Sequence, residues 1–338
     1  MARYKVFGWF LIGLLVALWC SPGMHGYAMT FTPTPPASLE TPPLRVLAIE
    51  SFLADIAQNV AGQRLTVSSL IPLGVDPHSF ELTPGDLRQI VESDVVIING
   101  GGLEEFLQEV LQSASGKWQL IEAAKGLTFR EPYEHGAEEG EEHTAKSTEE
   151  EVMQGEESHH EHENDPHFWL DPNNVIRYVE NIRDGLSQAD PAGALVYAQN
   201  AETYNERLRE LDQWIVTQVE QIPLERRLLV TNHESFGYFA DRYGFRVIGT
   251  ILPGVSTGAS PSAQQLAHLI ELIKETGAPA IFLETGTNPQ LAEQIARDTG
   301  VKVVSNLYTH SLSDADGPAP TYLDMMRHNT RLIVEALR

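Results

Sequence analysis

Short apolar runs alternate with amphipathic segments through most of this sequence. An apolar run at Leu44–Ile49 predicts a strand, and the pattern that follows predicts a helix over 51–62, closed by Gly62. The apolar run at 65–72 predicts a second strand, which ends at a proline. The rest of this half predicts a helix, a buried strand and a second helix, over 85–94, 95–100 and 103–113. Such alternation is typical of a parallel sheet covered on both faces.

The same order of elements recurs in the last third of the chain. Glu234-Ser235-Phe236 repeats Glu50-Ser51-Phe52, and the apolar run at 245–253 ends in proline as the run at 65–72 does. Further strand and helix patterns follow in the same sequence as before. We therefore expect two similar α/β lobes, about 44–170 and 227–338, each with a parallel sheet flanked by helices.

The segment 171–226 lies between these two repeats. Between Pro191 and Pro223 it contains no helix-breaking cluster, and its apolar positions follow helical spacing, at Leu195, Ala198, Leu208, Leu211, Ile215 and Val219. About thirty helical residues would extend roughly 45 Å. The sequence therefore predicts that one long, rigid helix joins the lobes.

The N-terminus has the pattern of an export signal. Arg3 and Lys5 precede an apolar run that is short for a membrane span, and residues 1–28 end in small residues suited to cleavage after Ala28. Lipidation at Cys20 is the alternative, but Leu18-Trp19 before it fits that signal poorly. A Pro/Thr-rich stretch, 29–43, predicts a disordered linker. We expect a soluble protein outside the cytoplasm.

Charge and composition single out the stretch 131–165. It holds fourteen acidic side chains and one basic one, so it contributes about half of the formal charge of −24 and should be a solvated, disordered loop. That charge argues against nucleic-acid binding. The loop is either a solvating acidic insert or a weak auxiliary metal site, and we favour the latter because imidazole is a common zinc ligand. Its histidines are His135, His143, His159, His160 and His162.

Four other histidines lie where ligands collect in parallel sheets, beyond the carboxyl ends of strands. His78 and His167 each follow an Asp-Pro pair in the first lobe, while His233 and His310 follow strands of the second. Each alone could be an ordinary polar loop residue, but their joint placement predicts one metal site in the cleft between the lobes. His268 and His328 lie within predicted helices, where surface positions are expected. With one cysteine in the chain, the metal site cannot be built from cysteines.

The sequence resembles the zinc/manganese solute-binding proteins of ABC transporters, the ZnuA/TroA-type family. The resemblance covers the mature chain through DPHSFELTP, the histidine-rich insert, DPHFWLDP, VTNHESFGYFADRYG and DGPAPTYLDMMRHN. It implies two α/β lobes joined by one long helix, with His78, His167 and His233 as ligands of one metal. It also implies delivery to a membrane permease with its ATPase, without enzymatic activity; we expect a monomer.

The chain departs from the family pattern at the fourth ligand position, where the family usually has aspartate and this chain has His310. We favour His310 as the ligand, with Glu284 as the alternative ligand or as a residue that orients an imidazole. Four imidazoles suit Zn²⁺, and also copper, nickel or cobalt, better than manganese.

Two other functions remain open at the level of sequence. A secreted zinc hydrolase is disfavoured, because Gly237 stands where an HExxH motif beginning at His233 needs its second histidine. A metal buffer without a transporter is the other alternative.

Overall fold

A computed structural model of the chain describes residues 44–107, 110, 118–130 and 164–338. The described part contains two four-stranded parallel sheets, with the strand orders β2-β1-β3-β4 and β6-β5-β7-β8. The first sheet is formed by β1 (Val46–Ala48), β2 (Val67–Ser69), β3 (Val95–Ile98) and β4 (Gln119–Glu122). The second is formed by β5 (Leu228–Thr231), β6 (Arg246–Thr250), β7 (Ala280–Glu284) and β8 (Lys302–Leu307). The two strand orders are the same, so the repeat in the sequence is also a repeat in topology.

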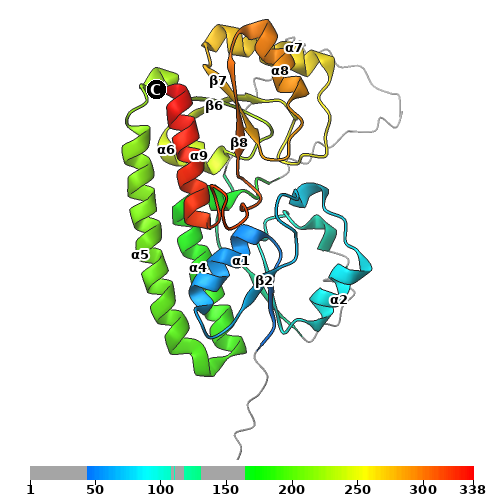
Figure 1. Cartoon of the computed structure of the whole chain (residues 1–338), viewed down its shortest axis with the longest axis vertical. Coiled ribbons are helices and arrows are strands. Elements are labelled where there is room, and N and C mark those ends of the chain that lie inside the picture. Colours follow the sequence, from blue (N-terminus) through cyan, green and yellow to red (C-terminus); the bar gives the residue numbers. More distant parts are fainter. Residues whose placement is uncertain (1–43, 108–109, 111–117, 131–163) are drawn as a thin grey trace, which may run out of the picture. The chain divides into compact units, whose positions relative to one another are not determined.

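Helices cover both sheets (Figure 1). In the first lobe they are α1 (Ser51–Ala61), α2 (Pro84–Glu92) and α4 (Pro172–Ala189). The second lobe has α6 (Gly237–Tyr243), α7 (Ala263–Thr276), α8 (Gln290–Thr299) and α9 (Tyr322–Leu337). Short 3₁₀ turns lie at η1 (Pro77–Ser79), η2 (Glu105–Leu107), η3 (Phe168–Leu170), η4 (Pro191–Gly193) and η5 (Leu224–Arg226).

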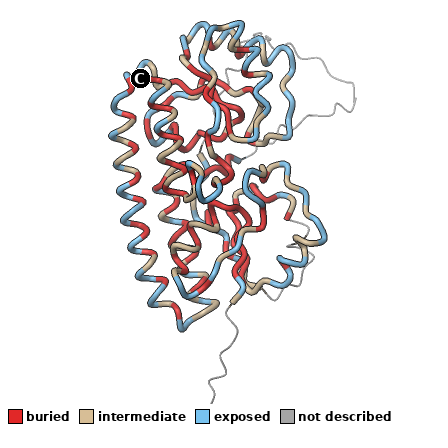
Figure 2. Tube along the Cα trace, viewed as in Figure 1, coloured by how far each residue is buried: buried red, intermediate tan, exposed pale blue. Residues whose placement is uncertain are grey.

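Successive strand residues serve opposite faces of each sheet, as the pleat requires. In β1, Val46 and Ala48 join the core shared with α1 and α4, while Leu47 packs with the smaller cluster on the α2 side. In the second lobe, the cluster between the sheet and α7/α8 is separate from the core on the other face. Buried positions therefore concentrate in the sheets and exposed ones on the outward helix faces (Figure 2).

The long helix α5 (Ala194–Val219) links the lobes. Its 26 residues correspond to about 39 Å. It packs against α1 and α4 of the first lobe and against α6 and α9 of the second, through buried residues that include Tyr204, Leu208 and Leu211. The predicted fold class, two α/β lobes with parallel sheets joined by a long helix, is confirmed.

Two local expectations differ from the structure, and the helix expected over 103–113 is tested only in part. The helix expected over 103–113 is described only as the turn η2 and residue 110, because 108–109 and 111–117 lie outside the described residues. The segment 171–226 is not only a connection, since α4 packs on β3 and β4 and completes the first lobe. Asp165 does not belong to the solvated loop 131–165: it is buried, whereas 131–163 lie outside the described residues.

The expected signal 1–28 and linker 29–43 also lie outside the described residues. Among the residues described, no helix is long and apolar enough to cross a membrane.

Candidate metal centre

Two Asp-Pro-His motifs hold the first-lobe histidines in the same way. His78 lies in η1, and the Oδ1 atom of Asp76 accepts its backbone N–H at 3.0 Å. His167 precedes η3, and the Oδ1 atom of Asp165 accepts its backbone N–H at 3.0 Å as well. Proline between aspartate and histidine restricts the backbone, so each motif presents its imidazole from a short, fixed turn. The second turn also binds the ring, because Nδ1 of His167 lies 2.8 Å from Oδ1 of Asp165.

The second-lobe histidines follow the strands β5 and β8. The hydroxyl of Thr231, the last residue of β5, donates to the carbonyl of His233 at 2.8 Å and so fixes the turn after the strand. The peptide before His310 is fixed by Trp169, whose Nε1 donates to the carbonyl of Thr309 at 2.7 Å. Trp169 belongs to η3, so the turn that follows His167 also positions His310.

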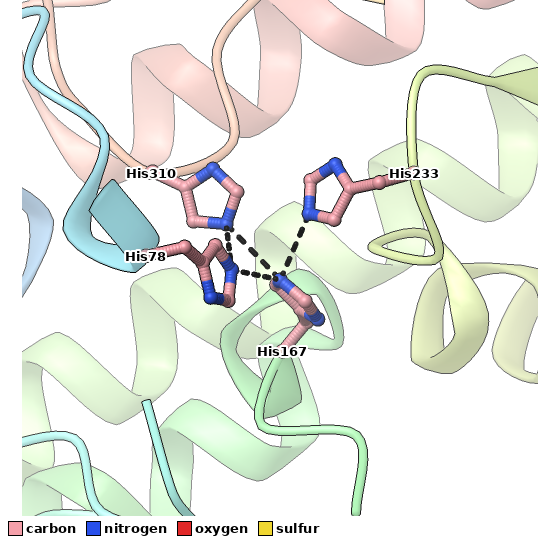
Figure 3. A group of neighbouring side chains, drawn as sticks. All are labelled: His78, His167, His233 and His310. Carbon is pink, nitrogen blue, oxygen red and sulfur yellow. Dashed lines mark hydrogen bonds between the residues drawn. The ribbon is translucent and has the colours of Figure 1, made fainter. Parts of the chain in front are cut away.

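All four predicted histidines converge at their Nε2 atoms (Figure 3). Nε2 of His167 lies 3.0 Å from that of His310 and 3.3 Å from those of His78 and His233. Nε2 of His78 lies 3.2 Å from that of His310, and all four ligand atoms are within 4.8 Å of one another. In a tetrahedral zinc site with Zn–N near 2.05 Å, ligand nitrogens are about 3.3 Å apart. The cluster is therefore close to the geometry that a tetrahedral cation requires.

Glu284, the predicted alternative ligand, lies on the opposite side of the imidazoles. Its Oε1 atom is 2.7 Å from Nδ1 of His233, a charge contact rather than a well-aligned hydrogen bond, and its Oε2 atom is 3.2 Å from Nδ1 of His310. It also accepts the hydroxyls of Thr309, at 2.5 Å, and Ser235, at 3.2 Å. A carboxylate facing Nδ1 favours the tautomer whose Nε2 is free to bind a metal. In this geometry the Glu284 carboxylate faces the Nδ1 atoms of two rings, and the Nε2 atom of His310 completes the group of four.

The charge states of these groups follow from burial and from Glu284. Burial, together with the other rings, lowers the pKa of His78 to about 2 and that of His167 well below its usual value. Burial would also lower the pKa of His233, but the Glu284 carboxylate outweighs it and raises that pKa. The attraction of His233 likewise lowers the pKa of Glu284 although burial acts in the opposite direction. His78 and His167 are therefore neutral at ordinary pH, as metal ligands must be.

Asp165 and Trp169 are site residues that the sequence analysis missed. Asp165 is the last residue of an acidic run, so composition alone does not distinguish it from its acidic neighbours. The repeated Asp-Pro-His motif, however, identifies it as the counterpart of Asp76. Its pKa rises to about 7 because it is buried, although the N–H of His167 opposes this. No sequence signal identified the bond between Trp169 and Thr309, because it joins residues far apart in the chain.

The other histidines do not join the cluster. His328 bonds to the carbonyl of Asn306 at 3.0 Å, and His268 lies on α7. Across the described ranges, the four histidines form the one group that could hold a metal ion. The five loop histidines, His135, His143, His159, His160 and His162, lie outside those ranges.

Two cavities adjoin the cluster. The first, about 300 Å³, is lined by residues of both lobes, including Asp76, Glu284 and His310. The second, about 500 Å³, is lined by residues that include His78 and Asn164. His167 and His233 are fully buried, so His78 and His310 are the rings that solvent reaches.

Comparison with known proteins gives consistent matches over most of the chain. Residues 46–336 match the family described as ZnuA, zinc-uptake complex component A, periplasmic. The manganese-binding lipoprotein MntA of Halalkalibacterium halodurans is 33% identical over 294 residues, 87% of this chain and 88% of that protein. The manganese ABC transporter substrate-binding lipoprotein PsaA of Streptococcus mitis is 29% identical over 296 residues, 87% and 89% of the two chains. The solved structure of the periplasmic zinc-binding protein TroA from Treponema pallidum matches with a TM-score of 0.73 at 28% identity, over 88% of this chain and 99% of that one.

Proposed function

Because the chain belongs to the ZnuA family, and is therefore a metal-binding substrate-binding protein of an ABC transporter rather than an enzyme, we propose that its cargo is zinc. The observation that carries this proposal is the convergence of four imidazole Nε2 atoms without a carboxylate oxygen among them. Nitrogen ligands in a tetrahedron suit zinc, whereas manganese prefers oxygen ligands. His78, His167, His233 and His310 are the proposed ligands, and Glu284 supports two of them.

Manganese is the competing cargo, because the relatives MntA and PsaA are named for it. The test is a competition titration of metal-free mature protein with zinc and manganese against a chromophoric chelator. We expect one tight zinc site and much weaker manganese binding. Manganese binding as tight as zinc binding would reject the zinc assignment while leaving the family assignment intact.

Delivery to a permease with its ATPase and export to the outside of the cytoplasm complete the proposed role. We propose that residues 1–28 direct export and that the mature protein is a monomer. Cys20 remains the alternative anchor point, and both MntA and PsaA are named lipoproteins. The intact mass of the exported protein distinguishes cleavage after Ala28 from lipidation at Cys20.

A further inference from the structure

The two lobes can be compared residue by residue through their strand registers. Leu70 donates its N–H to the carbonyl of Ala48 in the first lobe, and Ile251 donates to Thr231 in the second, each at the end of the central strand. Ala48 and Thr231 are therefore equivalent, and so are the residues two positions later. By this register Glu50 occupies in the first lobe the position that His233 occupies in the second, one residue before Glu234, with which the sequence repeat aligns it.

The same comparison pairs Asn99 with Glu284. In the first sheet Ala48 is the partner of Ile97, and in the second sheet Thr231 is the partner of Phe282. Two residues after these partners stand Asn99 and Glu284. Glu284 faces the rings of two proposed ligands. Asn99, its counterpart in the first lobe, is therefore a candidate for a similar positioning role.

Asn99 is fully buried and bonds to the loop that carries His167. Its Nδ2 donates to the carbonyl of Pro166 at 3.1 Å and to that of Gly100 at 2.8 Å, and its Oδ1 accepts the hydroxyl of Tyr178. The Pro166 carbonyl belongs to the peptide that links Pro166 to His167. We propose that Asn99 is a positioning residue of the metal site, which fixes this peptide and is itself held by a Glu50–Glu104 carboxyl pair. The inference rests on the proposed role of His167 as a ligand.

Glu104 holds the backbone on which Asn99 stands. Its Oε1 atom accepts the N–H of Asn99, and its Oε2 atom accepts the N–H of Gly100 at 3.1 Å. Gly100 has a φ of +84°, a conformation that favours glycine, so the chain turns directly after these two N–H groups. An ionised Glu104 is the acceptor that this arrangement needs, because both of its oxygens receive a donor.

Glu50 is the protonated partner of the ionised Glu104. It is 1% exposed, lies against Glu104, and neither of its carboxyl oxygens receives a donor from the described residues. Two buried carboxylates in contact would repel each other strongly, whereas a protonated carboxyl beside a carboxylate forms a strong hydrogen bond. Burial, and then the charge of Glu104, raise the pKa of Glu50 well above its usual value, and burial raises that of Glu104 to about 7. One proton shared by the pair therefore leaves Glu104 ionised and able to hold Asn99.

The first test compares two asparagines of similar chemistry. Asn99→Ala removes the bond to Pro166, whereas the control Asn181→Ala removes bonds of 2.7 and 2.9 Å to the carbonyls of Ala123 and Lys125, which hold no proposed ligand. We expect Asn99→Ala to weaken zinc binding about 10- to 100-fold, as loss of an outer partner of a metal ligand does. Asn181→Ala should leave zinc affinity unchanged. The Co²⁺-loaded Asn99→Ala protein should also show an altered d–d absorption spectrum, because that spectrum reports ligand geometry.

The outcomes separate this inference from the proposed function. If the parent protein fails to bind zinc, the proposed function is wrong. If the parent binds zinc and Asn99→Ala lowers the melting temperature of the metal-free protein without changing zinc affinity or the Co²⁺ spectrum, Asn99 is merely structural and the inference is overturned. Glu104→Gln provides a second variant should Asn99→Ala not fold; we expect a loss of zinc affinity in the same direction, and unchanged affinity would contradict the proposal.

A third variant tests the shared proton. Glu50→Gln keeps a donor toward Glu104 at every pH, so zinc affinity should be retained. The parent pair has pKa values above those of the unfolded chain, so the folded state binds more protons and loses stability as the pH rises from about 5 to about 8. Glu50→Gln should therefore gain melting temperature relative to the parent over this range; Tyr178, the other buried titratable group beside the pair, is unchanged in both proteins. Loss of one bound metal equivalent in Glu50→Gln would show that the pair holds a metal ion instead of a proton.

Discussion

Replacing His310 by alanine tests the residue at which this chain departs from the family pattern. The substitution removes the Nε2 atom that lies 3.0 Å from that of His167 and 3.2 Å from that of His78. Structural zinc sites with four ligands bind with roughly 10–16 kcal/mol, so one ligand corresponds to about 2.5–4 kcal/mol, or about 60- to 700-fold in affinity. His310 lines the 300 Å³ cavity, so water can take the vacant position. We therefore expect the loss to fall near the lower end of that range.

Competition titration at constant pH measures the loss, and the melting curve of the metal-free variant controls for folding. Glu284→Gln is the matched comparison, because it keeps the size of the side chain and removes the charge facing His233 and His310. We expect the smaller effect there, about 10- to 100-fold. If His310→Ala binds zinc as tightly as the parent while Glu284→Gln abolishes binding, Glu284 is the fourth ligand and His310 is not.

Three further predictions concern pH, the insert and metal choice. Zinc affinity should fall as the pH decreases from about 8 to about 5, because His233, whose pKa Glu284 raises against the effect of burial, must lose its proton before it can bind the ion. Fewer than four protons should be released per zinc, because His78 and His167 are already neutral; calorimetry in buffers of different ionisation enthalpy counts these protons, and release of four would contradict the pKa order. Deleting residues 133–162, while keeping Asp165, should reduce the total number of metal ions bound and leave the tight phase unchanged; loss of that phase would assign a primary ligand to the insert. His310→Asp introduces an oxygen ligand and should narrow the preference for zinc over manganese in paired titrations; an unchanged preference would show that the fourth ligand does not set selectivity.

The elements of the fold could be predicted because the strands and α5 carry strong periodic patterns. The four histidines could be predicted because they follow strands of two parallel sheets, whose carboxyl ends face a common cleft. The partners of the ligands could not be predicted so well. Fourteen acidic residues precede His167 between 131 and 165, and composition does not distinguish the one that is buried against its ring.

Contacts between distant parts of the chain were also beyond the sequence pattern. The sequence predicts that Trp169 is an ordinary aromatic residue of the core. In the structure its Nε1 also donates a hydrogen bond to the carbonyl of Thr309, 140 positions away. Glu50 falls at the start of a helix, where an acidic residue usually caps the first turn, yet its side chain makes no such bond and is buried against Glu104. In each case the tertiary fold, rather than local propensity, determines the role of the side chain.

In the proposed site, the imidazoles that would bind the metal are distinct from the carboxylates that would balance its charge. On the proposed function, neutral imidazoles would contact the ion and leave its double positive charge in a buried site, which is unfavourable without anions nearby. Glu284 and Asp165 provide two carboxylates behind the rings, 2.7 Å from Nδ1 of His233 and 2.8 Å from Nδ1 of His167. An ion at the Nε2 atoms would lie roughly 6 Å from each, and at an effective dielectric constant near 20 the attraction between the double positive charge and each ionised carboxylate is about 5–6 kcal/mol. The same attraction should lower the pKa of Asp165 from its value of about 7 in the metal-free protein, so that zinc binding itself ionises the residue that orients His167.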